Sequence, residues 1–320
     1  MKQTVLITGG AGFIGSHLAK VLLNRGDDVV IVDNFNDYYD PQIKRDRIKN
    51  LETLTKKPKV YELDVAHKKD LEKVFKENKL TKICHLAGQA GVRYSIENPY
   101  TYEESNVLGT LNMLELAKDY QVQDFVFASS SSVYGANTKT PFKESDKTET
   151  PMSLYAATKK MQELMAYTYH SLYDLNCTGL RFFTVYGDWY RPDMALFLFA
   201  EKMFKDEPIN VFNNGKMQRD FTYIDDIVAG VIASLDKAYP YEIFNIAGGK
   251  SIELMTYIDE LEKAIGKKAK KNMMPMQAGD VPVTDADISK ARKLLDYNPQ
   301  TTVEDGVGKF VQWYKDYYKI

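Results

Sequence analysis

The stretch TVLITGGAGFIGSHL, residues 4–18, decides the fold of this chain. Its β-branched, apolar beginning predicts a short buried strand over residues 4–8, and an amphipathic pattern then predicts a helix over residues 12–24. The spaced glycines Gly9, Gly12 and Gly15 lie at this junction. Such a turn lets the backbone approach a pyrophosphate, and the free N–H groups and dipole of a helix amino terminus favour the anion. The stretch therefore predicts a turn that binds a dinucleotide.

An acidic residue in the next apolar run strengthens this prediction. The run VVIVDN (29–34) contains Asp33, 18 residues after Gly15, where a carboxylate can accept hydrogen bonds from both ribose hydroxyls of an adenosine. A carboxylate there would repel a 2′-phosphate, and no arginine follows immediately, so NAD is favoured over NADP. Asp64 and Val65 are placed to flank the adenine, although Asp64 would serve equally well as a helix cap.

Apolar runs and helical patterns alternate over the first part of the chain. The predicted strands cover residues 4–8, 28–33, 59–63, 82–86, 124–129 and 178–183, and the predicted helices cover residues 12–24, 68–78, 99–120 and 153–173. Continuous apolar strands that alternate with helices are typical of an α/β fold with a doubly wound parallel sheet of the Rossmann type.

The pattern changes from about residue 187, where prolines interrupt it and the strands become short. We expect an NAD-binding Rossmann domain over residues 1–185 and a smaller mixed α/β substrate domain over residues 186–320, with some segments of the second returning to the first. Helices are predicted in the second part over residues 224–238, 254–265 and 303–318. Because no low-complexity linker separates the two parts, we expect them to pack closely around a cleft.

Composition excludes several classes of protein. The 320 residues carry 42 Lys and Arg against 44 Asp and Glu, a net charge of -2, so no basic field steers the chain onto a nucleic acid. The two cysteines, Cys84 and Cys177, lie in apolar runs, which favours reduced thiols in a cytoplasmic protein. No signal peptide, membrane span or metal site is expected.

A tyrosine and a lysine four residues apart, Tyr155 and Lys159, share one face of a predicted helix. Such a pair alone is common on helix surfaces. Here Ser129 to Ser132 end the fifth predicted strand, and a hydroxyl there can hydrogen-bond a reacting oxygen. A nearby ammonium favours the phenolate, which can take a proton from a substrate hydroxyl while hydride leaves the same carbon. The combination predicts an oxidoreductive step.

Seven features in this order resemble the extended short-chain dehydrogenase/reductase superfamily and, more narrowly, NAD-dependent nucleotide-sugar 4-epimerases. They are GGAGFIG (9–15), Asp33, LAGQAG (86–91), SSSSVYG (129–135), YAATK (155–159), RFFTVYG (181–187) and RDFTYIDD (219–226). The resemblance covers nearly the whole chain. It implies a tightly held NAD that is reduced and reoxidised in each turnover, a nucleotide-sugar domain, and a homodimer formed through the helices over residues 99–120 and 153–173.

The resemblance also implies roles for individual residues. Those expected around the NAD are Gly9, Gly12, Phe13, Ile14, Gly15, Asp33, Asn34, Asn36, Asp64, Val65, Leu86, Ala87, Gln89, Asn106, Tyr155, Lys159 and Phe183. Those expected around the UDP-sugar are Arg93, Ser130, Ser131, Ser132, Tyr155, Thr184, Arg191, Val211, Arg219, Gln277 and Asp280. Ser130 and Ser132 would lie beside the sugar C4 oxygen and Tyr155 would act as base and acid. Lys159 would hold the nicotinamide ribose and lower the tyrosine pKa.

Further stretches resemble the UDP-glucuronate 4-epimerase branch: DNFNDYYDP (33–41), QAGVRYS (89–95), RPDMALF (191–197) and PMQAGDVP (275–282). By this resemblance the substrate is UDP-glucuronate. Arg191 is the best candidate for its carboxylate, because a guanidinium can bind a carboxylate through two bonds, and Thr184 stands where neutral-sugar relatives commonly carry asparagine. For Arg93 a structural salt bridge is as good an interpretation, and Arg219 would also suit an exposed helix cap.

Neighbouring reactions remain alternatives. Oxidation at C4 of a uronate gives a ketone β to the carboxylate, which a decarboxylase lets decompose and an epimerase must protect. A 4,6-dehydratase needs an acid and a base across C5 and C6, and relatives of both kinds carry acidic residues where Ser131 and Ser132 stand here. Epimerisation is therefore favoured, with a neutral or N-acetylated UDP-hexose as the alternative substrate. A non-enzymatic NAD sensor is the alternative from another class.

Three positions depart from the family pattern. Gly88 stands where alanine is common, and Asp188 and Tyr190 replace the expected proline and glycine around Trp189. We expect a bulky Tyr190 and a negative charge beside Arg191 to narrow the pocket or weaken its grip on a carboxylate. These departures concern the substrate more than the reaction type.

Overall fold

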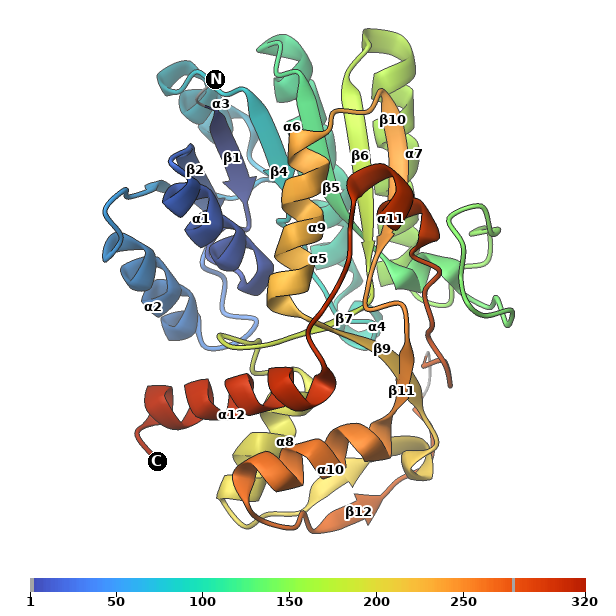
Figure 1. Cartoon of the computed structure of the whole chain (residues 1–320). Helices are drawn as coiled ribbons and strands as arrows, with labels where there is room; N and C mark the ends of the chain where they lie inside the picture. The colour runs from blue at the N-terminus through green and yellow to red at the C-terminus, as the bar shows by residue number, and fades with distance from the viewer. Residues whose placement is uncertain (1–2, 278–279) are drawn as a thin grey trace.

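The computed structural model describes residues 3–277 and 280–320, and its centre is a seven-stranded sheet (Figure 1). The strand order is β10-β6-β5-β4-β1-β2-β3, and every neighbouring pair is parallel. The strands are β1 (Thr4–Thr8), β2 (Asp28–Asp33), β3 (Lys59–Glu62), β4 (Lys82–His85), β5 (Asp124–Ser130), β6 (Asn176–Phe182) and β10 (Tyr241–Ile246). The predicted doubly wound, Rossmann-type α/β fold is confirmed.

Alternating side chains of the strands divide the core between the two faces of the sheet. In β1, Val5 and Ile7 join one apolar cluster and Leu6 joins the other, and all three side chains are fully buried. One face is covered by α1 (Phe13–Arg25), α2 (Pro41–Glu52) and α9 (Ile224–Asp236), and the other by α3 (Lys68–Glu77), α6 (Gly109–Asp119) and α7 (Leu154–Tyr173).

The carboxy-terminal part lies below the carboxyl ends of the central strands (Figure 1). It holds a three-stranded sheet of β7 (Thr184–Tyr186), β9 (Gln218–Tyr223) and β11 (Ser251–Glu253), and a pair of β8 (Ile209–Val211) with β12 (Lys271–Met273). Its helices are α8 (Ala195–Phe204), α10 (Leu254–Ile265), α11 (Ser289–Leu295) and α12 (Val303–Tyr318). The predicted helices over residues 254–265 and 303–318 have these same bounds, and α9 ends two residues before the predicted 238.

The chain returns to the large sheet after it has entered the second part. Strand β10 pairs with β6 over Tyr241 to Ile246, and α9 packs against α1. The two parts are therefore joined by several crossings of the chain.

Two local features were not predicted from the sequence. Helix α2 begins with Asp40, whose side chain accepts a hydrogen bond from the Gln42 amide at 2.9 Å, and Pro41 follows in the first turn. The helix predicted over residues 99–120 is interrupted: α5 (Pro99–Tyr102) runs into a π-helical segment, Glu103–Leu108, before α6, and a short α4 (Tyr94–Glu97) precedes it. Both features adjoin the cavity described below.

Within residues 3–277 and 280–320, no helix is long and apolar enough to cross a membrane. Cys84 and Cys177 are both buried and free.

Candidate active site

A cavity of about 860 Å³ lies at the carboxyl ends of the central strands. Its walls come from the glycine turn after β1, from the ends of β2, β4 and β5, from α7, and from the segments after β7 and around β8 and β9. Ligands of open α/β sheets bind at this edge of the sheet. Nearly all the residues predicted for NAD and UDP-sugar line this one space.

The glycine turn is tightly packed. Gly9 has a φ of +68°, and a Cβ there would lie 2.8 Å from the Ala87 amide nitrogen; a Cβ on Gly15 would collide with the Gly9 carbonyl oxygen. Gly12 is the amino-terminal cap of α1 and offers no side chain that could bond the first-turn amides. The first turn of α1 therefore lines the cavity with uncapped amides. The turn has the form that a pyrophosphate requires.

Asp33 lies at the end of β2 with its carboxylate held by the backbone. Its Oδ2 accepts from the Ala11 amide at 3.0 Å and its Oδ1 from the Phe35 amide at 2.9 Å. Burial raises the pKa of Asp33, while the nearby Lys44 ammonium and the two amides act against the rise. Asp64 accepts from the Asn34 side chain at 2.8 Å and from the Ala66 amide at 2.8 Å.

Helix α2 adds two cations that the sequence reasoning missed. The Nζ of Lys44 donates to the carbonyl oxygen and the side-chain Oδ1 of Asn36, at 2.9 and 2.6 Å. Arg47 is 1% exposed and donates to the Ala11 carbonyl at 3.1 Å and to the Trp189 carbonyl at 2.6 Å. The Asp-Pro start of α2 was the signal that could have located both.

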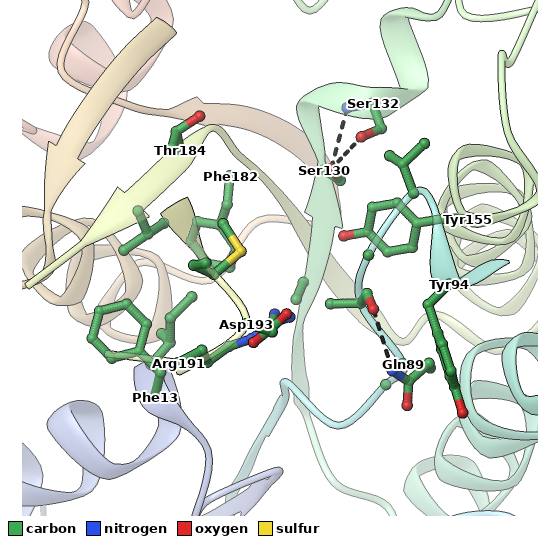
Figure 2. A pocket seen from close by; sticks show the side chains of 18 of the residues that line it. Phe13, Gln89, Tyr94, Ser130, Ser132, Tyr155, Phe182, Thr184, Arg191 and Asp193 are labelled. Atoms are coloured by element: carbon green, nitrogen blue, oxygen red, sulfur yellow. Dashed lines mark hydrogen bonds and ion pairs between the residues drawn. The ribbon is translucent and has the colours of Figure 1, made fainter. Parts of the chain in front are cut away.

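Tyr155 and Lys159 extend from the first two turns of α7 into the cavity wall. Ser153 caps this helix by accepting from the Ala156 amide at 3.1 Å. Lys159 is 5% exposed, donates to the Ala128 carbonyl at 2.8 Å, and has its pKa lowered to about 7 by burial. Figure 2 shows the Tyr155 ring near Ser130, across the cavity from Arg191.

The balance of effects on Tyr155 differs from the sequence expectation. Burial raises its pKa, and the groups that lower it are the Ser130 hydroxyl and the Arg191 charge. Lys159 instead points its ammonium at the backbone of β5. Among the charged groups of the protein, the Arg191 guanidinium, rather than the Lys159 ammonium, lowers the pKa of Tyr155 and so favours its phenolate form.

The serines after β5 divide between two sides of the strand. Ser130 donates to Ser132 Oγ at 3.2 Å and accepts from the Ser132 amide at 3.1 Å, and with Ser131 they line the cavity (Figure 2). Ser129 donates to Glu163 at 2.7 Å, inside the buried pair of Glu163 with Arg181. Ser129 also lines the cavity but its hydroxyl is engaged by Glu163, so the three later serines are the better candidates to contact a substrate.

The far end of the cavity is built from charged side chains that are partly paired with one another. Arg191 is engaged by Asp193 through two contacts of 3.0 and 2.5 Å. Arg93, 57% exposed, lies 3.7 Å from Asp280, so two residues predicted to bind substrate form an ion pair. Arg219 Nη1 donates to the Gln218 and Pro282 carbonyls at 2.9 and 3.2 Å.

Three predicted contact residues lie behind the wall rather than in it. Asn106 is fully buried in the π-helical segment and bonds the Gln89 backbone and Thr158, so it positions the loop that lines the cavity. Val211 is fully buried in β8, whose pairing turns its side chain into the core. The Oε1 of Gln277 is buried and has no hydrogen-bond partner among the described residues.

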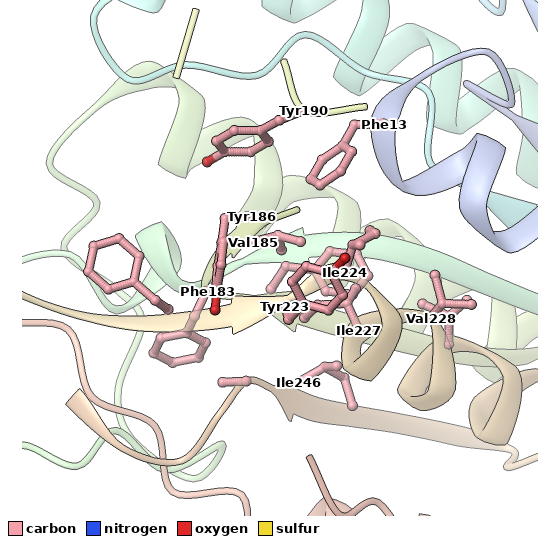
Figure 3. Close-up of a cluster of buried hydrophobic side chains, with 14 of the residues drawn as sticks. Phe13, Phe183, Val185, Tyr186, Tyr190, Tyr223, Ile224, Ile227, Val228 and Ile246 are labelled. Carbon is pink, nitrogen blue, oxygen red and sulfur yellow. The ribbon is translucent and has the colours of Figure 1, made fainter. Parts of the chain in front are cut away.

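Of the two unusual residues beside Trp189, Asp188 does not act as expected, whereas Tyr190 lines the cavity. Asp188 accepts from the Tyr223 hydroxyl at 3.0 Å and faces His17 at 3.5 Å, away from Arg191. Tyr190 is 3% exposed, and its ring packs 5.0 Å from Phe13 in an apolar cluster (Figure 3). The negative charge beside Arg191 is Asp193. A Cβ at Gly88 would lie 2.6 Å from the Asn106 Oδ1, so an alanine there would require the Asn106 side chain to shift.

Comparison with known proteins places the cavity in a family context. The model of the NAD dependent epimerase/dehydratase family matches residues 5–247. UDP-glucuronate 4-epimerase of Thermodesulfobacterium geofontis is 47% identical, over 97% of this chain and 96% of that protein. UDP-glucuronate 4-epimerase 4 of Arabidopsis thaliana is 48% identical, over 98% of this chain and 76% of that protein.

A solved structure shares the whole architecture. The UDP-glucuronic acid 4-epimerase of Bacillus cereus, crystallised with UDP-glucuronic acid and NAD, superposes with a TM-score of 0.91 at 35% identity. The match covers 99% of this chain and 100% of that one.

Proposed function

Since the chain belongs to the NAD-dependent epimerase/dehydratase family, we propose that it catalyses the reversible C4 epimerisation of UDP-glucuronate to UDP-galacturonate. The observation that carries this proposal is one cavity in which Tyr155 and Ser130 face Arg191 next to a dinucleotide turn. A proton acceptor, a cofactor site and a cation for a sugar carboxylate are thus within reach of one ligand.

The residues of the glycine turn fit an NAD molecule. Gly9 and Gly15 leave space that a side chain would fill, the uncapped amides of α1 suit the pyrophosphate, and Asp33 suits the adenosine ribose. Lys159 suits the nicotinamide ribose. NAD held there would supply reversible hydride transfer at the sugar C4.

Tyr155 carries the proton in both directions. Its phenolate oxygen takes the proton of the C4 hydroxyl as the hydride leaves, and the phenol so formed gives the proton back when the 4-keto sugar is reduced. Ser130 and Ser132 hydrogen-bond the same oxygen. Burial raises the pKa of Tyr155, whereas the Ser130 hydroxyl and the Arg191 charge lower it and so favour the phenolate.

Arg191, the cation at the far end of the cavity, favours epimerisation over decarboxylation. A C4 ketone of a uronate is β to the carboxylate, so a carboxylate fixed by Arg191 and Thr184 can be kept out of alignment with the carbonyl π system. Hydroxyls at Ser131 and Ser132 cannot act as the acid and base that a dehydratase requires. We infer that Arg219, Asp280 and Arg93 surround the UDP part.

We also propose a homodimer. On the outer surface of α7, Met161, Leu164 and Tyr167 are 48%, 56% and 55% exposed, and Leu108 and Leu111 of the neighbouring helix are both 38% exposed. An apolar strip of this kind is best covered by the same strip of a second copy. Light scattering at micromolar concentration should give twice the mass of 36.6 kDa, and a monomer would contradict the proposal.

Buried free thiols at Cys84 and Cys177 support a location in the reducing cytoplasm.

The function is tested by incubating the purified protein with NAD and UDP-glucuronate and following the products by NMR. UDP-galacturonate is the expected product, with Tyr155→Phe as the inactive control. UDP-xylose would indicate decarboxylation, and a stable 4-keto product would indicate an incomplete or different reaction. Turnover of UDP-glucose or UDP-N-acetylglucosamine alone would favour the neutral-hexose alternative.

A further inference from the structure

Arg191 and Asp193 form an ion pair in the wall of the cavity. The Nε of Arg191 lies 3.0 Å from Oδ1 of Asp193, and its Nη2 lies 2.5 Å from Oδ2. One edge of the guanidinium is therefore engaged by both carboxylate oxygens, the same arrangement by which arginine binds a carboxylate ligand. The two side chains are 20% and 22% exposed, so the pair is largely removed from water.

The pair is built within a single turn of the backbone. The Met194 amide donates to the Arg191 carbonyl at 3.2 Å, with Pro192 at the second position of the turn, and α8 begins at Ala195. Because both side chains belong to this turn, the ion pair can open by side-chain rotation, without movement of a helix or strand.

Tyr38 gives Asp193 a second partner. Its hydroxyl donates to Oδ2 of Asp193 at 3.3 Å, and its ring lies 5.9 Å from the guanidinium carbon of Arg191. Burial and the Asp193 charge raise the pKa of Tyr38 to about 12, so the hydroxyl keeps its proton at neutral pH. Asp193 therefore retains a hydrogen-bond donor when Arg191 turns away.

The net charge of the Arg191–Asp193 pair decides which sugars this part of the cavity accepts. A guanidinium that is buried without a counter-ion is unfavourable, but the pair of Arg191 with Asp193 has no net charge. A neutral hexose beside the pair leaves no charge uncompensated. A sugar carboxylate, in contrast, competes with Asp193 for the same edge of the guanidinium.

We propose that Asp193 is a specificity-determining residue that occupies Arg191 as an internal carboxylate and so reduces the preference of the site for uronates over neutral hexoses. A sugar carboxylate binds by taking over the guanidinium edge while Asp193 turns to Tyr38. The inference rests on the proposed function, because it requires a UDP-sugar in this cavity.

The test measures binding without turnover. In the Tyr155→Phe background and with NAD present, calorimetry gives the Kd of UDP-glucuronate and of UDP-glucose, each with Asp193 and with Asp193→Asn. Removing the competing charge should tighten UDP-glucuronate by about tenfold and leave UDP-glucose unchanged or weaker, because the ratio of the two affinities depends on the freed guanidinium. Asparagine has the same shape, so folding should be preserved.

Two further variants sharpen the test. Glu201→Gln removes the same charge from α8, where Glu201 pairs with Lys205 at 2.7 Å, and should leave the ratio of the two Kd values unchanged. Tyr38→Phe removes the alternative donor of Asp193 and should weaken UDP-glucuronate by about threefold. If Asp193→Asn weakens UDP-glucuronate, or changes both sugars equally, Asp193 only positions Arg191 and the proposal is wrong.

Failure of the proposed function is distinguishable from failure of this inference. If the unaltered protein does not epimerise UDP-glucuronate but Asp193→Asn still shifts the ratio of the Kd values, the function proposal fails and the specificity role of Asp193 stands. If turnover occurs and the ratio is unchanged, the opposite holds.

Discussion

The two ends of the cavity are built by different means. At the proposed dinucleotide end, the groups that would hold the cofactor are mainly backbone ones: glycines, helix amides and a carboxylate that is itself fixed by two amides. At the proposed sugar end, the groups that would hold the ligand are side chains from different segments of the chain. Two of the arginines there are paired with aspartates of the same wall. Backbone sites are rigid and tolerate little change, whereas paired side chains can exchange partners. The two ends should therefore respond differently to substitution.

The largest effect is expected where the two ends meet. Tyr155→Phe removes the proton carrier and should lower kcat by about 1,000-fold, the size of a general acid–base contribution, with little change in the affinity for UDP-sugar. Single-turnover kinetics with UDP-glucuronate measures the loss. If kcat fell by less than about tenfold, a group other than Tyr155 would carry the proton.

Lys159 allows a test of how much a buried ammonium at the dinucleotide end lowers the free energy of unfolding. Its pKa is about 7 in the folded protein, against about 10.4 in an unfolded chain. Between these values the unfolded chain binds a proton that the folded protein lacks, so the free energy of unfolding contributed by Lys159 rises as the pH increases from about 7 to about 10. Lys159→Met should abolish a rise of about 2–4 kcal/mol.

Urea unfolding at pH 7 and pH 9.5 checks this expectation. The exposed Lys20 on α1 provides the control, since Lys20→Met should leave the pH dependence of the wild-type protein intact. Equal slopes for Lys159→Met and wild type would show that the buried ammonium is compensated in the folded protein.

Gly15→Ala tests the rigidity of the glycine turn. The new Cβ would collide with the Gly9 carbonyl oxygen and lie 2.8 Å from the Cα of Gly10, so the turn must shift. We expect the affinity for NAD to fall by about tenfold or more and the stability by about 1–3 kcal/mol. Fluorescence titration and thermal unfolding measure both. At Gly308, where a Cβ meets nothing within 4 Å, Gly308→Ala should be neutral or slightly stabilising.

The smallest effect is expected at the rim of the sugar end. Arg93 is 57% exposed and 3.7 Å from Asp280, so Arg93→Ala should change the KM for UDP-glucuronate by less than about threefold. Arg191→Ala, in the largely buried position, should raise the same KM by more than about tenfold. Steady-state kinetics of the two variants side by side decides whether depth in the cavity determines the contribution of each arginine.

The sequence was sufficient for features that a short stretch determines. The glycine turn, Asp33 and the strands around them follow from local patterns, and the helices over residues 254–265 and 303–318 from their periodicity. Lys44 and Arg47 were missed because the Asp-Pro start of α2 was not recognised, although the signal was present.

Other features arise only from tertiary packing. The π-helical turn that buries Asn106 depends on its bonds to Gln89 and Thr158, and no spacing in the sequence indicates it. The negative charge beside Arg191 was expected at Asp188, whereas Asp188 is bonded to Tyr223 and lies near His17. Side-chain pairing between distant segments is the part that local patterns cannot supply.

Arg47 has a mechanical consequence. Its buried guanidinium fastens the carbonyl of Ala11, in the cofactor turn, to the carbonyl of Trp189, just before the turn that carries Arg191. Parting the two halves of the protein along this seam would break hydrogen bonds that water cannot easily replace. We expect a nucleotide sugar to enter at the opposite rim, near Arg93 and Asp280, where the Arg93 side chain is 57% exposed.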